Sequence, residues 1–102
     1  MTEVRWTEQA TDGLAAIKAF ISQDSPAYAL AVVGRLYRAV EQLAQFPDSG
    51  RIVPEHGRPE IRELVRPPYR IVYRRLSEVV EILLVFRSSL PLPTIPEGEG
   101  AG

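Results

Sequence analysis

The chain has 102 residues, of which 45% are hydrophobic and 25% charged, and its net charge is −1. This length fits a single domain with its own core, and the charge excludes a protein that holds nucleic acid through a large overall positive charge. The absence of cysteine excludes disulfides and thiolate metal sites. The first residues lack the apolar stretch of a signal peptide, and no apolar run is long enough to span a bilayer, so we expect a cytoplasmic protein.

The first half of the chain predicts one strand followed by two helices. Polar and apolar residues alternate over residues 3–6, which indicates a short strand ending at Trp6. Thr7 suits the N-cap of a helix over residues 8–22, although Gly13 weakens that helix without a reason visible in the sequence. Apolar residues follow at helical spacing: Ala10, Leu14, Ile17 and Ile21.

A second helix is predicted from Pro26 to about Gln45. Ser25 suits its N-cap, and proline is well tolerated in a first helical turn. Its apolar stripe consists of Ala29, Val33, Leu36, Val40 and Leu43. Because the connection between the two helices is short, we expect an antiparallel hairpin that packs on a sheet.

The second half predicts three further strands. Phe46-Pro47-Asp48-Ser49-Gly50 ends the second helix, and a polar loop is expected up to about Pro59. Strands are predicted over 60–66, 69–75 and 79–86, the last nearly all apolar and therefore central in the sheet. The order β-α-α-β-β-β gives an α+β fold with the helical hairpin on one face of a small, mainly antiparallel sheet. We expect one domain over residues 1–90 and a disordered Pro/Gly-rich tail over 91–102.

Positive charge is concentrated in the middle of the chain. Residues 51–87 hold eight arginines, no lysine and five glutamates, whereas the segments on either side are each net −2. If the Pro67-Pro68 turn pairs Arg66 with Arg70, one face of the sheet carries four arginines, and the opposite face carries apolar Tyr69, Ile71 and Tyr73. We expect the arginine face to be open to an anionic partner, because opposed like charges destabilise a sheet. Its members are Arg62, Arg66, Arg70 and Arg74.

A second interpretation of the same residues stays open. Guanidinium groups form planar, bidentate pairs with carboxylates and tolerate partial burial. The arginines could therefore be paired within the chain, with the nearby acidic residues Glu55, Glu60, Glu63, Glu78 and Glu81.

Several motifs together resemble one family of bacterial and archaeal proteins. Val-Arg-Trp-Thr-x-x-Ala at residue 4 is followed by the helical hairpin, by Leu-Ala-x-Phe-Pro-x-Ser-Gly-Arg at residue 43, by Ile-Arg-Glu-Leu at residue 61 and by Tyr-Arg-Ile-Val-Tyr-Arg at residue 69. This order resembles the RelE/ParE toxins of type II toxin–antitoxin systems over residues 4–87. The resemblance implies a toxin that a cognate antitoxin, ParD-like or similar, neutralises by laying a helix or strand over it.

The family implies two mechanisms, neither of which uses a metal or another cofactor. RelE-like members cleave mRNA in the ribosome with basic and aromatic residues, whereas ParE-like members inhibit DNA gyrase and cleave nothing themselves. For a nuclease, Arg62, Arg70 and Arg87 are the candidate catalytic residues. A nuclease also needs a general acid and base, yet the only histidine, His56, lies in the predicted loop, and neither His nor Tyr follows Arg87.

The sequence therefore favours the ParE-like mechanism. The alternatives are the RelE-like endonuclease and a degenerate toxin that only binds its antitoxin. In every case the residues expected to contact antitoxin or target are Arg62, Arg66, Arg70, Arg74 and Arg87.

Overall fold

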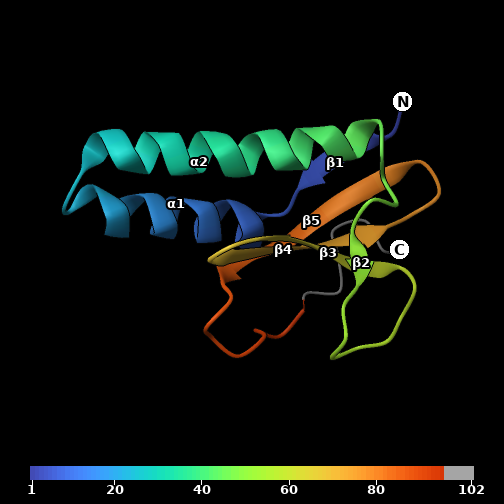
Figure 1. Cartoon of the computed structure of the whole chain (residues 1–102). Coiled ribbons are helices and arrows are strands. Elements are labelled where there is room, and N and C mark those ends of the chain that lie inside the picture. The colour runs from blue at the N-terminus through green and yellow to red at the C-terminus, as the bar shows by residue number, and fades with distance from the viewer. Residues whose placement is uncertain (96–102) are drawn as a thin grey trace.

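Two antiparallel helices lie across one face of a five-stranded sheet in the computed structural model, which describes residues 1–95 (Figure 1). The strand order is β1-β5-β4-β3-β2, with β1 parallel to β5 and every other pair antiparallel. The α+β fold predicted from the sequence is confirmed. The helices are α1 (Glu8–Ser22) and α2 (Pro26–Glu41), which continues as the 3-10 turn η1 (Gln42–Ala44), and the strands are β1 (Glu3–Trp6), β2 (Arg51–Ile52), β3 (Ile61–Arg66), β4 (Tyr69–Arg75) and β5 (Val79–Arg87).

Both predicted helix caps are present. The Thr7 hydroxyl accepts a hydrogen bond from the Ala10 N–H at 3.2 Å and donates one to the Ile82 carbonyl at 2.7 Å, which ties the start of α1 to the central strand. The Ser25 hydroxyl accepts from the Tyr28 N–H at 3.1 Å. These bonds satisfy N–H groups that have no partner inside a helix.

The main core lies between the helical hairpin and the sheet. Ala10 and Ile17 of α1 and Leu36 and Val40 of α2 pack against one side of β4 and β5. On β4 that side consists of Tyr69, Ile71 and Tyr73, as the alternation predicts. Trp6 packs partly against this core and stacks on Tyr37, with ring centroids 6.0 Å apart.

Gly13 allows α1 to approach β5 closely. A Cβ atom at this position would lie 2.4 Å from the Val85 carbonyl oxygen, far inside the contact distance of a carbon and an oxygen. The glycine that weakens the helix in isolation is therefore required by the packing of the helix on the sheet.

The register of β3 and β4 differs from the prediction. Arg66 pairs with Tyr69 across a two-residue Pro67-Pro68 turn with a cis peptide bond, so Leu64 pairs with Ile71 and Arg62 with Tyr73. The predicted register, in which Arg66 pairs with Arg70, was therefore wrong by one residue. A shift of one residue moves every side chain of a strand to the other face. The four arginines therefore do not share one face.

A second, smaller core lies on the face of the sheet that the helices do not cover. Val53, Ile61, Val72, Leu83, Leu84 and Phe86 form it, and Leu92 and Ile95 pack against it. Residues 91–95 thus have no regular secondary structure but contact the sheet, and residues 96–102 of the predicted disordered tail lie outside the described residues. β2 was also missed: the sequence predicted only a loop there. Within residues 1–95, no helix is both long and apolar enough to cross a membrane.

Candidate functional site

The predicted arginine face is divided between the two sides of the sheet. Because of the register, Arg62 and Arg66 point to the helix side, and Arg62 donates to the Gly50 carbonyl at 3.0 Å. Arg70 and Arg74 lie on the other side, where Arg74 forms an ion pair with the buried Glu81 at 3.8 Å. The prediction of one open, four-arginine surface was therefore wrong.

Arg70 is the centre of an internal ion-pair network. Its Nε donates to Glu63 at 2.5 Å, and its two terminal nitrogens donate to the two carboxylate oxygens of Glu55 at 2.9 and 3.0 Å. Glu63 also accepts from Arg51 at 2.7 Å. The guanidinium carbon lies 5.3 Å from the centre of the Phe86 ring, and the Arg70 residue is only 9% exposed. Intramolecular pairing, the second interpretation of the arginines, is confirmed for Arg70 and also for Arg51, Arg58 and Arg74.

The network lowers the pKa of the Glu55 carboxyl from 4.5 to about 2, chiefly through the hydrogen bonds from Arg70. A carboxyl whose pKa is lowered by folding stabilises the protein above its unfolded pKa and loses that contribution as the pH falls through the folded value. Glu55 therefore contributes fully above about pH 5 and almost nothing near pH 2.

Glu55→Gln is thus expected to be less stable than the parent protein at neutral pH, with a difference that shrinks steadily as the pH falls from about 5 to about 2. Urea unfolding of both proteins across this range measures the difference. A gap that stays constant down to pH 2 would contradict the assignment of this carboxylate to Arg70.

The aromatic and histidine candidates for catalysis do not meet at the arginines. Tyr73 is buried, and its hydroxyl donates to the Pro47 carbonyl and accepts from the Gly50 N–H, both at 2.9 Å. Burial raises the pKa of this phenol. His56 lies in the exposed loop between β2 and β3, beside Arg58 and Arg74. No group of three or more His, Cys, Asp or Glu side chains within residues 1–95 is arranged to hold a metal ion.

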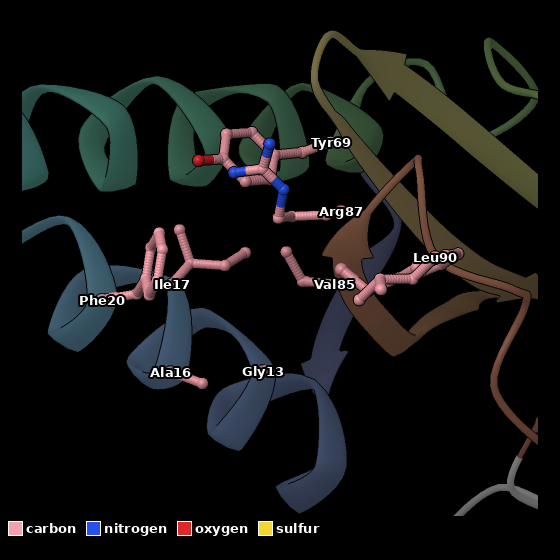
Figure 2. Close-up of a pocket in the computed structure, with 9 residues that line it drawn as sticks. Gly13, Ala16, Ile17, Phe20, Tyr69, Val85, Arg87 and Leu90 are labelled. Carbon is pink, nitrogen blue, oxygen red and sulfur yellow. The ribbon is translucent and has the colours of Figure 1, made fainter.

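An apolar hollow of about 320 Å³ opens between α1 and the end of β5 (Figure 2). Ile17 and Phe20 lie on one side of it and Val85 and Leu90 on the other, while Tyr69 and Arg87 lie at one end and Gly13 and Ala16 at the opposite end. Phe20 is 62% exposed and Leu90 is exposed as well, so large apolar side chains face solvent here. Of the five predicted site arginines, only Arg87 lines this hollow.

The sequence did not reveal the hollow. Its wall residues have the same apolar spacing as core residues, and only the exposure of Phe20 and Leu90 distinguishes them. One signal was available: Gly13 and Ala16 lack the larger apolar side chains that would fill this side of α1.

Comparison with known proteins identifies relatives across almost the whole chain. The family model described as the ParE toxin of the type II toxin–antitoxin system parDE matches residues 4–89. The protein Y4kP of Sinorhizobium fredii is 42% identical over 95 residues, which cover 90% of this chain and 94% of that protein. Toxin RelE2 of Caulobacter vibrioides is 37% identical over 86 residues, which cover 83% of this chain and 93% of that protein.

A solved structure shares the fold. A chain of the chromosomal ParDE toxin–antitoxin system from P. aeruginosa superposes with a TM-score of 0.69 at 28% identity. The match covers 85% of this chain and 96% of that one. The arrangement of helical hairpin and sheet described above is therefore that of a protein from a ParDE system.

Proposed function

Because the chain belongs to the ParE toxin family of type II toxin–antitoxin systems, we propose that it is a cytoplasmic toxin that inhibits DNA gyrase by binding it, without chemistry of its own. The observation that supports the non-catalytic mechanism is the pairing of the Arg70 guanidinium with carboxylates of the same chain. A guanidinium that stabilises a scissile phosphate must be able to contact it, but Arg70 donates to two carboxylates in the free protein, so a phosphate would have to displace Glu55 and would still lie beside the negative charge of Glu63.

The other groups that a nuclease needs are also engaged or distant. The Tyr73 hydroxyl is bonded on both sides inside the fold, and Arg62 donates to a backbone carbonyl. Arg87 remains exposed but has neither a histidine nor a second arginine among its neighbours in the hollow. General acid–base catalysis requires a proton donor and acceptor within hydrogen-bond reach of the substrate. Among the residues that line the hollow with Arg87, the Tyr69 hydroxyl is the one group that could transfer a proton, and the lack of a second such group supports the non-catalytic mechanism.

Cleavage of translated mRNA is the second candidate, since one relative carries the name toxin RelE2. The two functions differ in what controlled expression of this chain in bacteria would do. Gyrase inhibition predicts DNA breaks and an SOS response with intact mRNA, whereas ribosome-dependent cleavage predicts codon-phased cuts in mRNA. Normal growth with soluble protein would contradict both functions and leave a degenerate toxin that only binds its antitoxin.

We further propose that the antitoxin covers the apolar hollow beside α1. Exposed apolar surface rimmed by charge is typical of a protein-binding site, and an amphipathic helix presents apolar anchors that fit such a groove. Arg87 at the rim would select an acidic residue on that helix, and Arg66, which is half-buried, lies at the same end of the sheet. We propose these two arginines for the partner-binding role expected from the sequence.

Phe20→Asp is expected to weaken antitoxin binding at least about tenfold, because it places a charge in a desolvated contact. Leu30→Asp is the matched control: Leu30 is 60% exposed on α2 but does not line the hollow. Calorimetric titration of each variant with the antitoxin measures both effects. Equal losses for the two variants, or none for Phe20→Asp, would show that the antitoxin binds elsewhere.

A further inference from the structure

The Nε atom and the two terminal nitrogens of Arg70 donate to two carboxylates that differ greatly in exposure to solvent. Glu63, which accepts from Nε, has a side chain that is 0% exposed and also accepts from Arg51. Glu55, which accepts from both terminal nitrogens, has a side chain that is 44% exposed. Its segment, residues 54–59, is exposed throughout. The inner carboxylate therefore fixes the guanidinium in place, whereas the outer one lies at the surface.

This arrangement preorganises a fork of two N–H donors. Arg70 is oriented by Glu63 and by the Phe86 ring beneath it, so its rotamer does not depend on Glu55 alone. An incoming carboxylate would form the same bidentate pair that Glu55 forms now. Since the arginine is already ordered, such a ligand avoids most of the entropic cost of fixing a long side chain.

Space for a ligand exists beside the fork. A hollow of about 330 Å³ is lined by Arg51, Pro54, Glu55, Val65, Arg70 and Ser88. Arg51 is 61% exposed and adds a second cation at its rim. With Glu55 in place, the positive charges of Arg51 and Arg70 are balanced by the negative charges of Glu55 and Glu63. When Glu55 is displaced, the site has one excess positive charge. One excess charge fits a single carboxylate better than a polyanion.

The surroundings favour a carboxylate on a protein segment. Within the described residues β2 pairs only with Arg62 and Glu63, so the outer edge of β3 beyond Glu63 has no strand beside it. Val65 is exposed there, on the face that carries Arg70. An extended peptide can add to such an edge and direct alternate side chains to that face. Phe86, under the Arg70 guanidinium, also lines the hollow assigned above to the antitoxin, so both surfaces lie at the end of β5, on opposite faces of the sheet.

We propose that the two terminal nitrogens of Arg70 form a binding site for an acidic side chain of the antitoxin, and that Glu55 occupies this site in the free protein. The proposal rests on the antitoxin as partner but not on gyrase as target. In the complex, the antitoxin carboxylate replaces Glu55 on the two terminal nitrogens, and Glu63 keeps its bond to Nε throughout.

The site is tested with acetate and inorganic phosphate as probes on the full chain. Glu55→Ala leaves the fork empty, and about 0.2 M acetate is expected to raise its thermal midpoint by about 3 °C relative to chloride at equal ionic strength. The parent protein should show no comparable rise. Glu60→Ala, which removes another carboxylate from the same loop, and the double variant Glu55→Ala with Arg70→Lys should also show none. These comparisons separate site binding from the general stabilising effect of acetate.

Each result decides the proposal. A rise confined to Glu55→Ala supports a carboxylate site, no rise with either anion overturns it, and a rise with phosphate alone overturns the carboxylate assignment in favour of a phosphate group. If Glu55→Ala does not fold, Glu55→Gln replaces it, and the shift of the Arg70 Nε–H NMR signal with acetate becomes the measurement.

A second titration tests the assignment to the antitoxin. Without its internal competitor, Glu55→Ala is expected to bind the antitoxin at least about threefold more tightly than the parent protein. Unchanged or weaker binding would overturn this assignment even if acetate binds. Failure of the chain to affect gyrase would leave both readouts unchanged, so the two proposals can fail separately.

Discussion

Gly13→Ala is expected to lower the free energy of unfolding by about 2–3 kcal/mol, although alanine is the better helix former. The new methyl group would lie 2.4 Å from the Val85 carbonyl oxygen, so α1 must move away from β5. That movement weakens the packing of Ile17 and its neighbours against the sheet. Alanine recovers only about 1 kcal/mol of helix propensity, which does not offset the loss.

Gly34→Ala provides the matched control for this prediction. Gly34 is also in the interior of a helix, but a Cβ atom there would meet only the end of the flexible Arg38 side chain, at 3.3 Å. We expect this variant to be stabilised by about 0.5–1 kcal/mol. Urea unfolding of both variants measures the contrast, and a stabilised Gly13→Ala would refute the close approach of α1 to β5.

Glu63→Ala is expected to cost about 3–5 kcal/mol, the usual cost of removing one partner from a buried ion pair. Glu63 is 1% exposed and accepts from both Arg70 and Arg51. Without it, the Nε of the largely buried Arg70 loses its acceptor, and a cavity forms beside the second core. Glu55 at the surface can compensate only part of this loss.

Glu60→Ala is the control for the buried pair. Glu60 accepts from Arg58 at 3.0 Å, with both side chains well exposed, so the loss should be at most about 1 kcal/mol. Denaturant unfolding at neutral pH compares the two variants. Similar costs for Glu63→Ala and Glu60→Ala would show that the Arg70 network does not organise the second face of the sheet.

The parts of the fold that depend on local sequence were predicted well. Thr7 and Ser25 cap the two helices as expected, and α1, β1 and β4 have the predicted bounds. The near-continuous apolar run of β5 indicated a central strand, and this strand lies between β1 and β4. In these segments periodicity and capping chemistry both point to the same structure.

The parts that depend on contacts between distant segments were not predicted. The sequence does not determine whether Arg66 pairs with Tyr69 or with Arg70 across the Pro67-Pro68 turn. This shift of one residue in the register decides on which face of the sheet each arginine lies. β2 has two residues, too few to show a period. The reason for Gly13, and the hollow beside it, become visible only when α1 is packed on β5, which the sequence does not specify.

The same limit applies to the site. Composition identified a segment rich in arginine and left open whether a partner or the chain itself neutralises it. The structure supplies the carboxylates of Glu55 and Glu63 for Arg70 and that of Glu81 for Arg74. Besides the Arg70 site proposed above, Arg87 and the exposed apolar residues of the hollow form the surface that we propose for a partner.

We propose that this toxin acts by binding gyrase and not by cleaving RNA. The most direct test adds the purified full chain to purified gyrase and measures DNA supercoiling and cleaved DNA, with and without equimolar antitoxin. We predict that supercoiling falls, that gyrase-linked DNA breaks accumulate, and that the antitoxin reverses both effects. Unchanged gyrase activity, together with cleavage of mRNA on translating ribosomes by the same preparation, would contradict the claim.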